Sequence, residues 1–245
     1  MINMSAGMIL FLKISVLFVV SYFLGGIHFA AIISKLKGVD IKSLGSGNPG
    51  TMNMLRNFGV KTAVLTLVLD ALKGALPALL GYFLLYDNEI LSGVTTAAPN
   101  WLGYYISGGS KIGVYIAGIS VIIGHMFPVI KRFKGGKGVA SSVGVFLVAN
   151  PIITLIAFAL AFAYLYIGKY GSVASFIFLL CASIAEIVLA IIYKENFVVI
   201  ILIATMFALI TWAHRANLVR LFNGTESDIN IRRQLQKQKE GKLLK

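Results

Sequence analysis

Long apolar runs separated by short polar segments dominate the chain. A helix that crosses the hydrocarbon core of a bilayer needs about 20 apolar residues. Runs near that length predict spanning helices at 8–34, 62–86, 112–130, 173–193 and 197–213. A further apolar stretch, 139–167, is interrupted by Asn150-Pro151. The pattern therefore predicts an all-α, polytopic integral membrane bundle.

The stretch 139–167 has two interpretations, one kinked helix or two short helices around a turn. An Asn-Pro pair favours the turn, because the residue before proline avoids helical backbone angles. Two helices give about seven spans, with the N-terminus outside and most Lys and Arg on the cytoplasmic side, as the positive-inside rule requires. One kinked helix would put the basic C-terminal tail outside. The weak point is 139–149, because eleven helical residues cover only about 16 Å. Such a helix has to be shielded by protein or line a cavity.

Composition supports the same class of protein. Of 245 residues, 58% are hydrophobic and 13% are charged, whereas soluble domains carry about 25% charge. A disordered chain is excluded and a soluble enzyme is disfavoured. The segment MINMSAG lacks a basic region, so we expect the first apolar run to be retained as a span. We expect one membrane domain over 1–226, a basic cytoplasmic tail over 227–245, and a multi-pass location in a membrane.

The net charge of +13 indicates anionic partners. Basic residues cluster between apolar runs, which is typical of cytoplasmic loops and can also hold an anionic substrate, so we expect no nucleic-acid partner. The one cysteine, Cys181, excludes an internal disulfide and a cysteine metal site. No metal cluster is visible in the sequence, and we expect no metal and no cofactor. Residues 90–110 are interpreted as an external or interfacial loop.

Unusual polar segments share the cytoplasmic face under seven spans. They are 44–56, 133–142, 214–226 and a shorter one at 170–175. Their convergence follows from the predicted topology and is not an independent observation.

The second polar segment has the clearest physical interpretation. Glycines around Lys134 and Lys137 let backbone N–H groups turn toward an oxyanion, and the next helix begins there with its partial positive charge. This describes a phosphate cradle. It is not a Walker A loop, because Gly138 stands where Ser or Thr is required. The alternative is a basic, flexible cytoplasmic loop.

The other polar segments also have two interpretations each. Gly45-x-Gly47-x-x-Gly50 has the spelling of a dinucleotide fingerprint, but no βαβ unit surrounds it, so we reject that match. The segment is then either part of an anion site that includes Arg56 or a tight turn capping the next span. His214 and Asn217 lie on one helical face, where the histidine can act as a base or a donor. The alternative is an ordinary histidine at a span end.

Several charged residues fall inside the spans. Asp70 and Lys73 are spaced as one helical pair, and we favour a structural ion pair over a functional one. Lys13 and Glu186 fall nearer the external side, where we expect their side chains to snorkel. His28 is interpreted as a satisfied interhelical residue.

Four groups of residues, in order along the chain, resemble the bacterial membrane glycerol-3-phosphate acyltransferases that use acyl phosphate, the PlsY family. The resemblance covers roughly 8–226. Its motifs are Gly45-Ser46-Gly47-Asn48-Pro49-Gly50…Asn53…Arg56, Asp70-x-x-Lys73-Gly74-x-x-Pro77, Gly124-His125-x-Phe127-Pro128…Phe133-Lys134-Gly135-Gly136-Lys137-Gly138-Val139-Ala140, and His214-x-x-Asn217-Leu218-x-Arg220-Leu221-x-x-Gly224-x-Glu226. Departures from the family pattern include Thr51-Met52 in place of Ala-Thr, and Ser141 in place of threonine.

The resemblance implies a reaction. The 1-hydroxyl of sn-glycerol 3-phosphate attacks the carbonyl of a fatty acyl phosphate, and lysophosphatidic acid and inorganic phosphate result. The His-x4-Asp signature of the commoner glycerolipid acyltransferases is absent from the sequence. Partners would be glycerol 3-phosphate, fatty acyl phosphate and membrane lipid.

The resemblance also implies roles for individual residues. The set includes catalytic residues Ser46, Arg56, Lys137, His214 and Asn217; substrate-binding residues Gly47, Asn48, Gly50, Asn53, Lys134, Gly135, Gly136, Gly138, Ser141 and Ser172; and supporting residues Asp70, Lys73 and Glu226. Lys137, Arg56 and Ser172 would hold glycerol phosphate. Ser46, Gly47 and Asn48 would cradle the acyl phosphate. His214 and Asn217 would position the glycerol hydroxyls, with either His214 or a donor phosphate oxygen as base.

Two other classes of function fit parts of the sequence. A membrane carrier for an organic phosphate could use the basic loops and the Asp70/Lys73 pair, but no inverted repeat is present. A non-catalytic scaffold could bind anionic lipid through its tail, but this leaves the glycine-rich and histidine segments unexplained.

Overall fold

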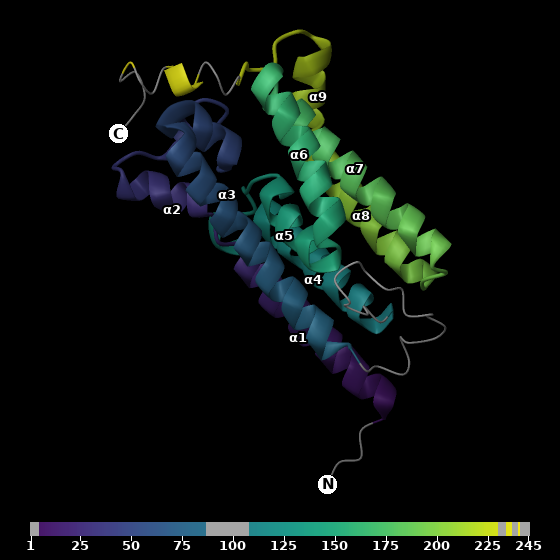
Figure 1. The fold of residues 1–245 in the computed structure, drawn as a ribbon. Helices are drawn as coiled ribbons and strands as arrows, with labels where there is room; N and C mark the ends of the chain where they lie inside the picture. Colours follow the sequence, from purple (N-terminus) through teal and green to yellow (C-terminus); the bar gives the residue numbers. More distant parts are fainter. Residues whose placement is uncertain (1–4, 87–107, 230–233, 237–239, 241–245) are drawn as a thin grey trace.

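The computed structural model describes residues 5–86, 108–229, 234–236 and 240, and these form an all-helical bundle (Figure 1). The predicted loop at 90–110 lies almost wholly outside them. The α-helices are α1 (Ala6–Gly25), α2 (Phe29–Leu36), α3 (Thr51–Leu84), α4 (Gly108–Met126), α5 (Val139–Ala149), α6 (Pro151–Ile167), α7 (Gly171–Ile192), α8 (Phe197–Ala213) and α9 (Arg215–Phe222). Two short 3-10 turns lie at Ile41–Ser43 and Val129–Lys131.

Helix length and hydropathy identify the membrane character directly. In the described residues, four segments are long and apolar enough to cross a bilayer: Ala6–Leu36, Thr51–Leu84, Ser110–Lys131 and Gly171–Ile192. A fifth results if α8 and α9, which meet at 56°, form one span. Helices α5 and α6, with 11 and 17 residues, are shorter apolar helices.

The Asn150-Pro151 turn is confirmed. Helix α5 ends at Ala149 and α6 begins at Pro151, while Asn150 has extended backbone angles between them. The Asn150 side chain accepts a hydrogen bond from the Ile153 N–H at 3.2 Å and so caps α6. Helix α5 is buried along most of its length, as its short span requires.

The predicted single run 8–34 is divided in the structure. Helix α1 stops at Gly25 and α2 starts at Phe29, with His28 in an extended conformation between them. Both ring nitrogens of His28 lie at carbonyl oxygens, 2.8 Å from Gly26 O and 3.0 Å from His125 O. These contacts stabilise the non-helical segment between α1 and α2, and they agree with the interhelical role expected for His28.

Glycines bring the central helices close together. A Cβ at Gly74 on α3 would collide with the Ser141 carbonyl on α5, and one at Gly144 on α5 would collide with Ala71 of α3. Gly25 on α1 is similarly placed against Val121 of α4. Small residues at such crossings let helices pack backbone to backbone, which is the main source of association in lipid.

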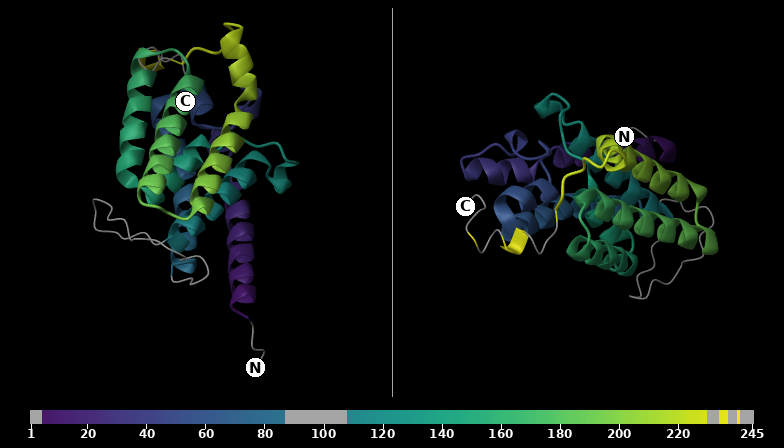
Figure 2. Two further views of the ribbon diagram at one scale, coloured as in Figure 1. Left: turned by 90° about the vertical axis from the view of Figure 1, so that its right-hand side faces the viewer. Right: turned by 90° about the horizontal axis from the view of Figure 1, so that it is seen from above.

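The bundle has two parts. Helix α3 packs against α1, α4 and α5, whereas α6, α7 and α8 lie side by side (Figures 1 and 2). Helix α5 contacts both parts, and α8 packs against α4. Within α3, Gly59 has φ 81° and ψ −176°, so the helix is kinked there. Only glycine adopts these angles without strain, and the kink turns the segment that carries Arg56.

One group of buried charges lies near the start of α4 and the end of α7. The Lys111 Nζ atom is 2.7 Å from Glu195 Oε1 and 3.3 Å from Glu186 Oε2, and the Tyr115 hydroxyl donates to Glu186 Oε2 at 2.9 Å. The expectation that Glu186 snorkels is wrong, because its side chain is fully buried in this cluster. Lys13 is half-buried, and its Nζ donates to the Leu84 carbonyl at 3.1 Å.

Candidate functional site

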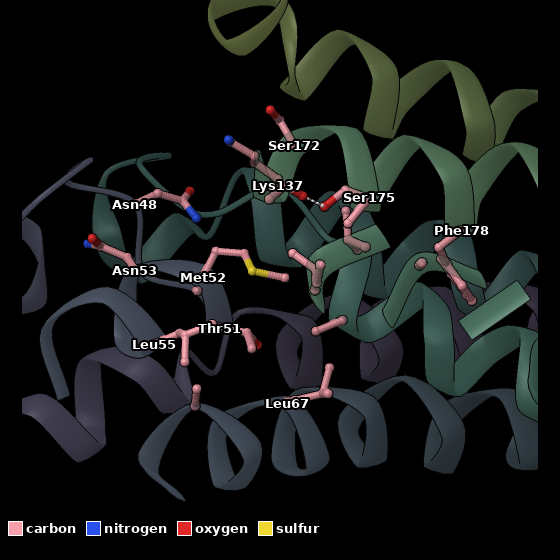
Figure 3. Close-up of a pocket in the computed structure, with 18 of the residues that line it drawn as sticks. Asn48, Thr51, Met52, Asn53, Leu55, Leu67, Lys137, Ser172, Ser175 and Phe178 are labelled. Atoms are coloured by element: carbon pink, nitrogen blue, oxygen red, sulfur yellow. Dashed lines mark hydrogen bonds between the residues drawn. The ribbon is translucent and has the colours of Figure 1, made fainter. Parts of the chain in front are cut away.

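A cavity of about 370 Å³ lies between α3 on one side and α6 and α7 on the other. Figure 3 shows Asn48, Lys137 and Ser172 along one side of it and Thr51, Leu55 and Leu67 along the other. The polar segments predicted from the sequence all contribute to its wall. Polar lining residues include Ser46, Asn48, Thr51, Asn53, Arg56, Lys137, Ser172, Ser175, His214, Asn217, Arg220 and Glu226, and the backbones of Gly50 and Gly138 also line it.

The glycine-rich loop before α3 is shaped by Asn53. The buried Asn53 side chain donates to the carbonyls of Ile41 and Leu44, at 3.2 and 2.9 Å, and accepts from the Ser46 N–H at 3.2 Å. Gly47 has φ 67° and donates its own N–H to Leu44 O. Both residues therefore help to build the turn, and substrate binding by Asn53 and Gly47 stays a prediction. The turn leaves Ser46 exposed at the rim.

Arg56 is presented to the cavity from the first turns of α3. Its Nη1 atom lies 3.5 Å from Asn53 Oδ1, and its buried Nε has no hydrogen-bond partner among the described residues. Burying a guanidinium donor without a partner is costly. A bound anion would supply the missing acceptor.

Glu226 organises the opposite wall. Its carboxylate accepts hydrogen bonds from the Ser172 hydroxyl at 3.0 Å, the Asn217 amide at 2.7 Å and the Arg220 Nε at 2.8 Å. Burial raises the pKa of the Glu226 carboxyl, but hydrogen bonds from Asn217, Arg220 and Ser172 outweigh it and leave the pKa below its usual value. The carboxylate is therefore charged, and it joins the start of α7 to α9.

Lys137 is connected to the same network. Its Nζ donates to the Asn217 Oδ1 atom, so the amide links Lys137 to Glu226. An ammonium has three donors, and Asn217 takes one of them. Burial lowers the pKa of Lys137 to about 8; the Glu226 charge opposes this shift, while Arg220 and Arg56 add to it. A buried cation next to other cations is ready to bind an anion.

The His214 ring has a defined tautomer. Its Nδ1 atom is 2.8 Å from the Ile210 carbonyl oxygen, which can only accept a hydrogen bond. The proton of the neutral ring is therefore on Nδ1, and Nε2 carries a free lone pair. His214 is buried and lines the cavity, where this lone pair can accept a proton or a hydroxyl hydrogen.

Part of the predicted phosphate cradle does not reach the cavity. Lys134 is exposed at the surface, and its carbonyl accepts from Lys42 Nζ at 3.1 Å. Gly135 and Gly136 face His125, against which a Cβ at either position would collide, and the Gly136 N–H donates to His125 O at 2.9 Å. Ser141 is buried at the crossing of α5 with α3. In this structure these four residues contact other parts of the protein, and substrate binding by Lys134, Gly135, Gly136 and Ser141 stays a prediction.

Other lining residues were not predicted as site residues. Thr51 Oγ1 is buried without a partner among the described residues, and Thr51 lines the cavity. The family pattern did not distinguish Thr51 from Met52 as a site residue. Arg220 lies on the same helical face as His214 and Asn217, a spacing that could have identified it. His125 lines the cavity as well. Asp70, which was predicted as a supporting residue, also lines it, and Lys73 Nζ lies 2.7 Å from its carboxylate in the predicted ion pair.

The remainder of the cavity is apolar. Leu67, Val143, Phe158 and Phe178 are among the side chains that form this part. Between α3 and α6 it opens past Val64 and Phe162, each 51% exposed on the outer surface of the bundle. The cavity thus combines a cationic end with an apolar channel, which suits an amphiphile with an anionic headgroup.

Comparisons with known proteins agree with this geometry. Residues 15–224 match the family described as glycerol-3-phosphate acyltransferase. A glycerol-3-phosphate acyltransferase of Paraburkholderia phytofirmans is 36% identical, with 86% of this chain and 88% of the relative covered. One of Clostridioides difficile is 35% identical, with 88% and 95% covered.

Solved structures give the same result. The crystal structure of PlsY (YgiH), an integral membrane glycerol 3-phosphate acyltransferase, in its glycerol 3-phosphate form matches with a TM-score of 0.69 and 32% identity, over 88% of this chain and 94% of that one. Its lysophosphatidic acid form matches with the same score over 91% and 98%. The chain therefore belongs to the glycerol-3-phosphate acyltransferase family of the PlsY type.

Proposed function

We propose that this protein transfers a fatty acyl group from acyl phosphate to the 1-hydroxyl of sn-glycerol 3-phosphate. The single observation that carries the proposal is the joining of a cationic end, with Lys137, Arg56 and Arg220, to an apolar channel in one cavity. Relatives are named glycerol-3-phosphate acyltransferase, and the matching structures are titled as glycerol 3-phosphate and lysophosphatidic acid forms.

The two phosphate groups would bind at different parts of the cationic end. Lys137 and Arg56 hold the phosphate of glycerol 3-phosphate, and the two Lys137 donors that Asn217 leaves available face that group. Ser172 joins them by turning its hydroxyl from Glu226 to the phosphate. Ser46 and Asn48, at the loop before α3, hold the phosphate of the acyl donor. Placing both reactants in one cavity supplies orientation, which can account for a large share of the rate enhancement.

The chemistry is a nucleophilic substitution at the acyl carbon. The 1-hydroxyl oxygen forms a bond to the carbonyl carbon, the bond from that carbon to the phosphate oxygen breaks, and inorganic phosphate leaves. The hydroxyl proton passes to His214 Nε2, whose lone pair is free because Nδ1 donates to Ile210 O, or to an oxygen of the departing phosphate. The leaving group is good, so little acid catalysis is needed, and no metal or cofactor enters the proposal.

Replacing His214 distinguishes the two proton acceptors. His214→Gln removes the basic nitrogen while it keeps a polar side chain near the hydroxyl. If His214 is the base, kcat falls by about 100- to 10,000-fold, the usual contribution of general base catalysis. Survival of substantial kcat assigns the proton to the phosphate oxygen.

The acyl chain would occupy the apolar channel and reach lipid between α3 and α6. The exposed Val64 and Phe162 at that opening suit a hydrocarbon surrounding. A lateral opening lets a donor that is already dissolved in the bilayer enter without passing through water.

The proposed arrangement in the membrane has seven spans, with the N-terminus outside and the C-terminus in the cytoplasm. It counts α5 and α6 as two spans, and it puts the cationic end at the cytoplasmic face of a bacterial plasma membrane. The membrane domain is 1–226, and 227–245 form a basic tail whose first residues pack back, since the Ile229 N–H donates to Lys169 O at 2.6 Å. Cysteine labelling at positions 46, 137 and 214 tests this, and accessibility from opposite faces would refute it.

One assay tests the function. Purified protein receives palmitoyl phosphate and glycerol 3-phosphate, with palmitoyl-CoA as the control donor, in the presence of a chelator. The expected products are lysophosphatidic acid and phosphate in equal amounts from the acyl phosphate and none from the CoA ester. A carrier would release no phosphate, and that outcome would overturn the proposal.

A further inference from the structure

His125 lies between the buried Asp70–Lys73 ion pair and the glycine-rich turn at 135–138. The Lys73 Nζ atom forms an ion pair with Asp70 Oδ1 at 2.7 Å, donates to the Ile27 carbonyl and lies 2.8 Å from His125 Nδ1. Because an ammonium only donates, His125 Nδ1 accepts, and the proton of the ring is on Nε2. The ion pair therefore fixes both the position and the tautomer of the His125 ring.

The backbone of His125 is used as fully as its ring. His125 is in the last turn of α4, where carbonyls have no partner within the helix. Its carbonyl oxygen accepts from the Gly136 N–H at 2.9 Å and lies 3.0 Å from His28 Nε2. The His28 ring stacks on the His125 ring with centroids 4.7 Å apart. The carbonyl oxygen of His125 and one face of its ring thus each have a definite neighbour.

The turn at 135–138 is packed closely against His125. A Cβ at Gly136 would collide with the Nε2 atom of His125, and one at Gly135 would collide with the His125 carbonyl. Lys137 follows directly, and Gly138, with φ 88°, is the N-cap of α5. Lys137 is therefore held between a residue bonded to His125 and the start of a buried helix.

We propose that His125 is a positioning residue for glycerol 3-phosphate, which acts by holding the 135–138 turn so that Lys137 reaches the substrate phosphate. The inference rests on the proposed function of Lys137. Asp70, Lys73 and His28 act through His125. A displacement of about 1 Å in a group that orients substrate can cost on the order of 100-fold in rate, so loss of the support affects binding of one substrate selectively.

A matched set of variants tests the proposal by steady-state kinetics. His125→Leu removes the Lys73 bond and is expected to raise the KM for glycerol 3-phosphate by on the order of 10- to 100-fold. The KM for palmitoyl phosphate stays near the wild-type value. His125→Asn keeps an acceptor near the Nδ1 position and restores most of the affinity. Tyr115→Phe, which deletes a buried hydrogen bond at the other end of α4, leaves both KM values unchanged.

Two further variants test the proposal independently of how well His125→Leu folds. In a Lys137→Ala background, His125→Leu adds little, because both changes remove the same contact. If His125→Leu does not fold, Gly136→Ala pushes the turn away from an intact His125 and is expected to give the same selective rise in KM. An unchanged glycerol 3-phosphate KM in the folded variant, with activity lost only in proportion to folded protein, overturns the positioning role. A wild type without acyl transfer overturns the proposed function itself.

Discussion

Two groups of buried charges, at opposite ends of α4 and α7, use similar residues for different purposes. In the first, around Lys111, one ammonium is surrounded by two carboxylates and a tyrosine that supports one of them. In the second, at the cavity, one carboxylate, Glu226, faces Lys137, Arg56 and Arg220. The first group has little cationic capacity to spare, while the second has cations that a substrate can neutralise.

The difference indicates how to separate structural from functional burial of charge. A buried cation matched by carboxylates is strongly destabilising to break but provides no site for an anion. A buried cation with hydrogen-bond capacity left over, beside a cavity, is a candidate for ligand binding. The first group should therefore control stability, and the second should control catalysis.

The largest expected effect is at Lys137. Lys137→Ala should lower kcat/KM for glycerol 3-phosphate by on the order of 100- to 1,000-fold, since it removes a preorganised charge from a water-poor site. Thermal stability should hold, because repulsion with Arg56 and Arg220 is relieved at the same time. Steady-state kinetics with both substrates varied measures the effect. Wild-type turnover in this variant would remove Lys137 from the site.

At Lys111 we expect a loss of stability without a change in the KM values. Lys111→Met leaves Glu186 and Glu195 buried together without their cation, which costs about 3–5 kcal/mol of unfolding free energy. Thermal unfolding can be followed by dye labelling of Cys181, the chain's one cysteine. The folded fraction should retain the wild-type KM values. A normal melting temperature with altered KM would mean that the two groups of charges are not separable.

An intermediate effect is expected when Glu226 is neutralised. Glu226→Gln replaces one oxygen by a donor that faces other donors, and lost hydrogen bonds to a charged group cost about 1.5–3 kcal/mol, or roughly 10- to 100-fold. The loss should fall on the glycerol 3-phosphate KM, because glutamine keeps only one acceptor oxygen, so either Asn217 and Ser172 or Arg220 loses its acceptor. Glu195→Gln is the control for the other group and should affect melting only. Equal kinetic losses in both variants would contradict the comparison.

The smallest effect is a shift in pH dependence. Glycerol 3-phosphate is largely a dianion above pH 7, because the second pKa of such a phosphate is about 6. With the pKa of Lys137 lowered to about 8, kcat/KM should fall as pH rises through about 8, since the ammonium is lost. Lys137→Arg, which stays protonated, should move this limb to higher pH if the variant is active. An alkaline limb at the same pH in that variant would assign it to another group.

Local patterns predicted some features and not others. The Asn150-Pro151 turn follows from backbone chemistry at two residues, so it was predictable. The clustering of the polar segments followed from run lengths and basic residues. In contrast, Gly135 and Gly136 look the same in sequence as glycines that turn N–H groups toward a ligand, although they are small here to accommodate His125. The pairing of Lys111 with Glu186 depends on how α4 and α7 meet, which no local pattern encodes.

The opening between α3 and α6 has a consequence for how the enzyme would be measured. For a donor that enters from the bilayer, the effective concentration is its mole fraction in the lipid. Inert lipid added to a vesicle therefore dilutes the donor even when its bulk concentration is constant. The product, a single-chain amphiphile, would be released into the same leaflet. The reaction rate would then depend on the lipid composition of the bilayer. The membrane would supply the acyl donor and take up the product.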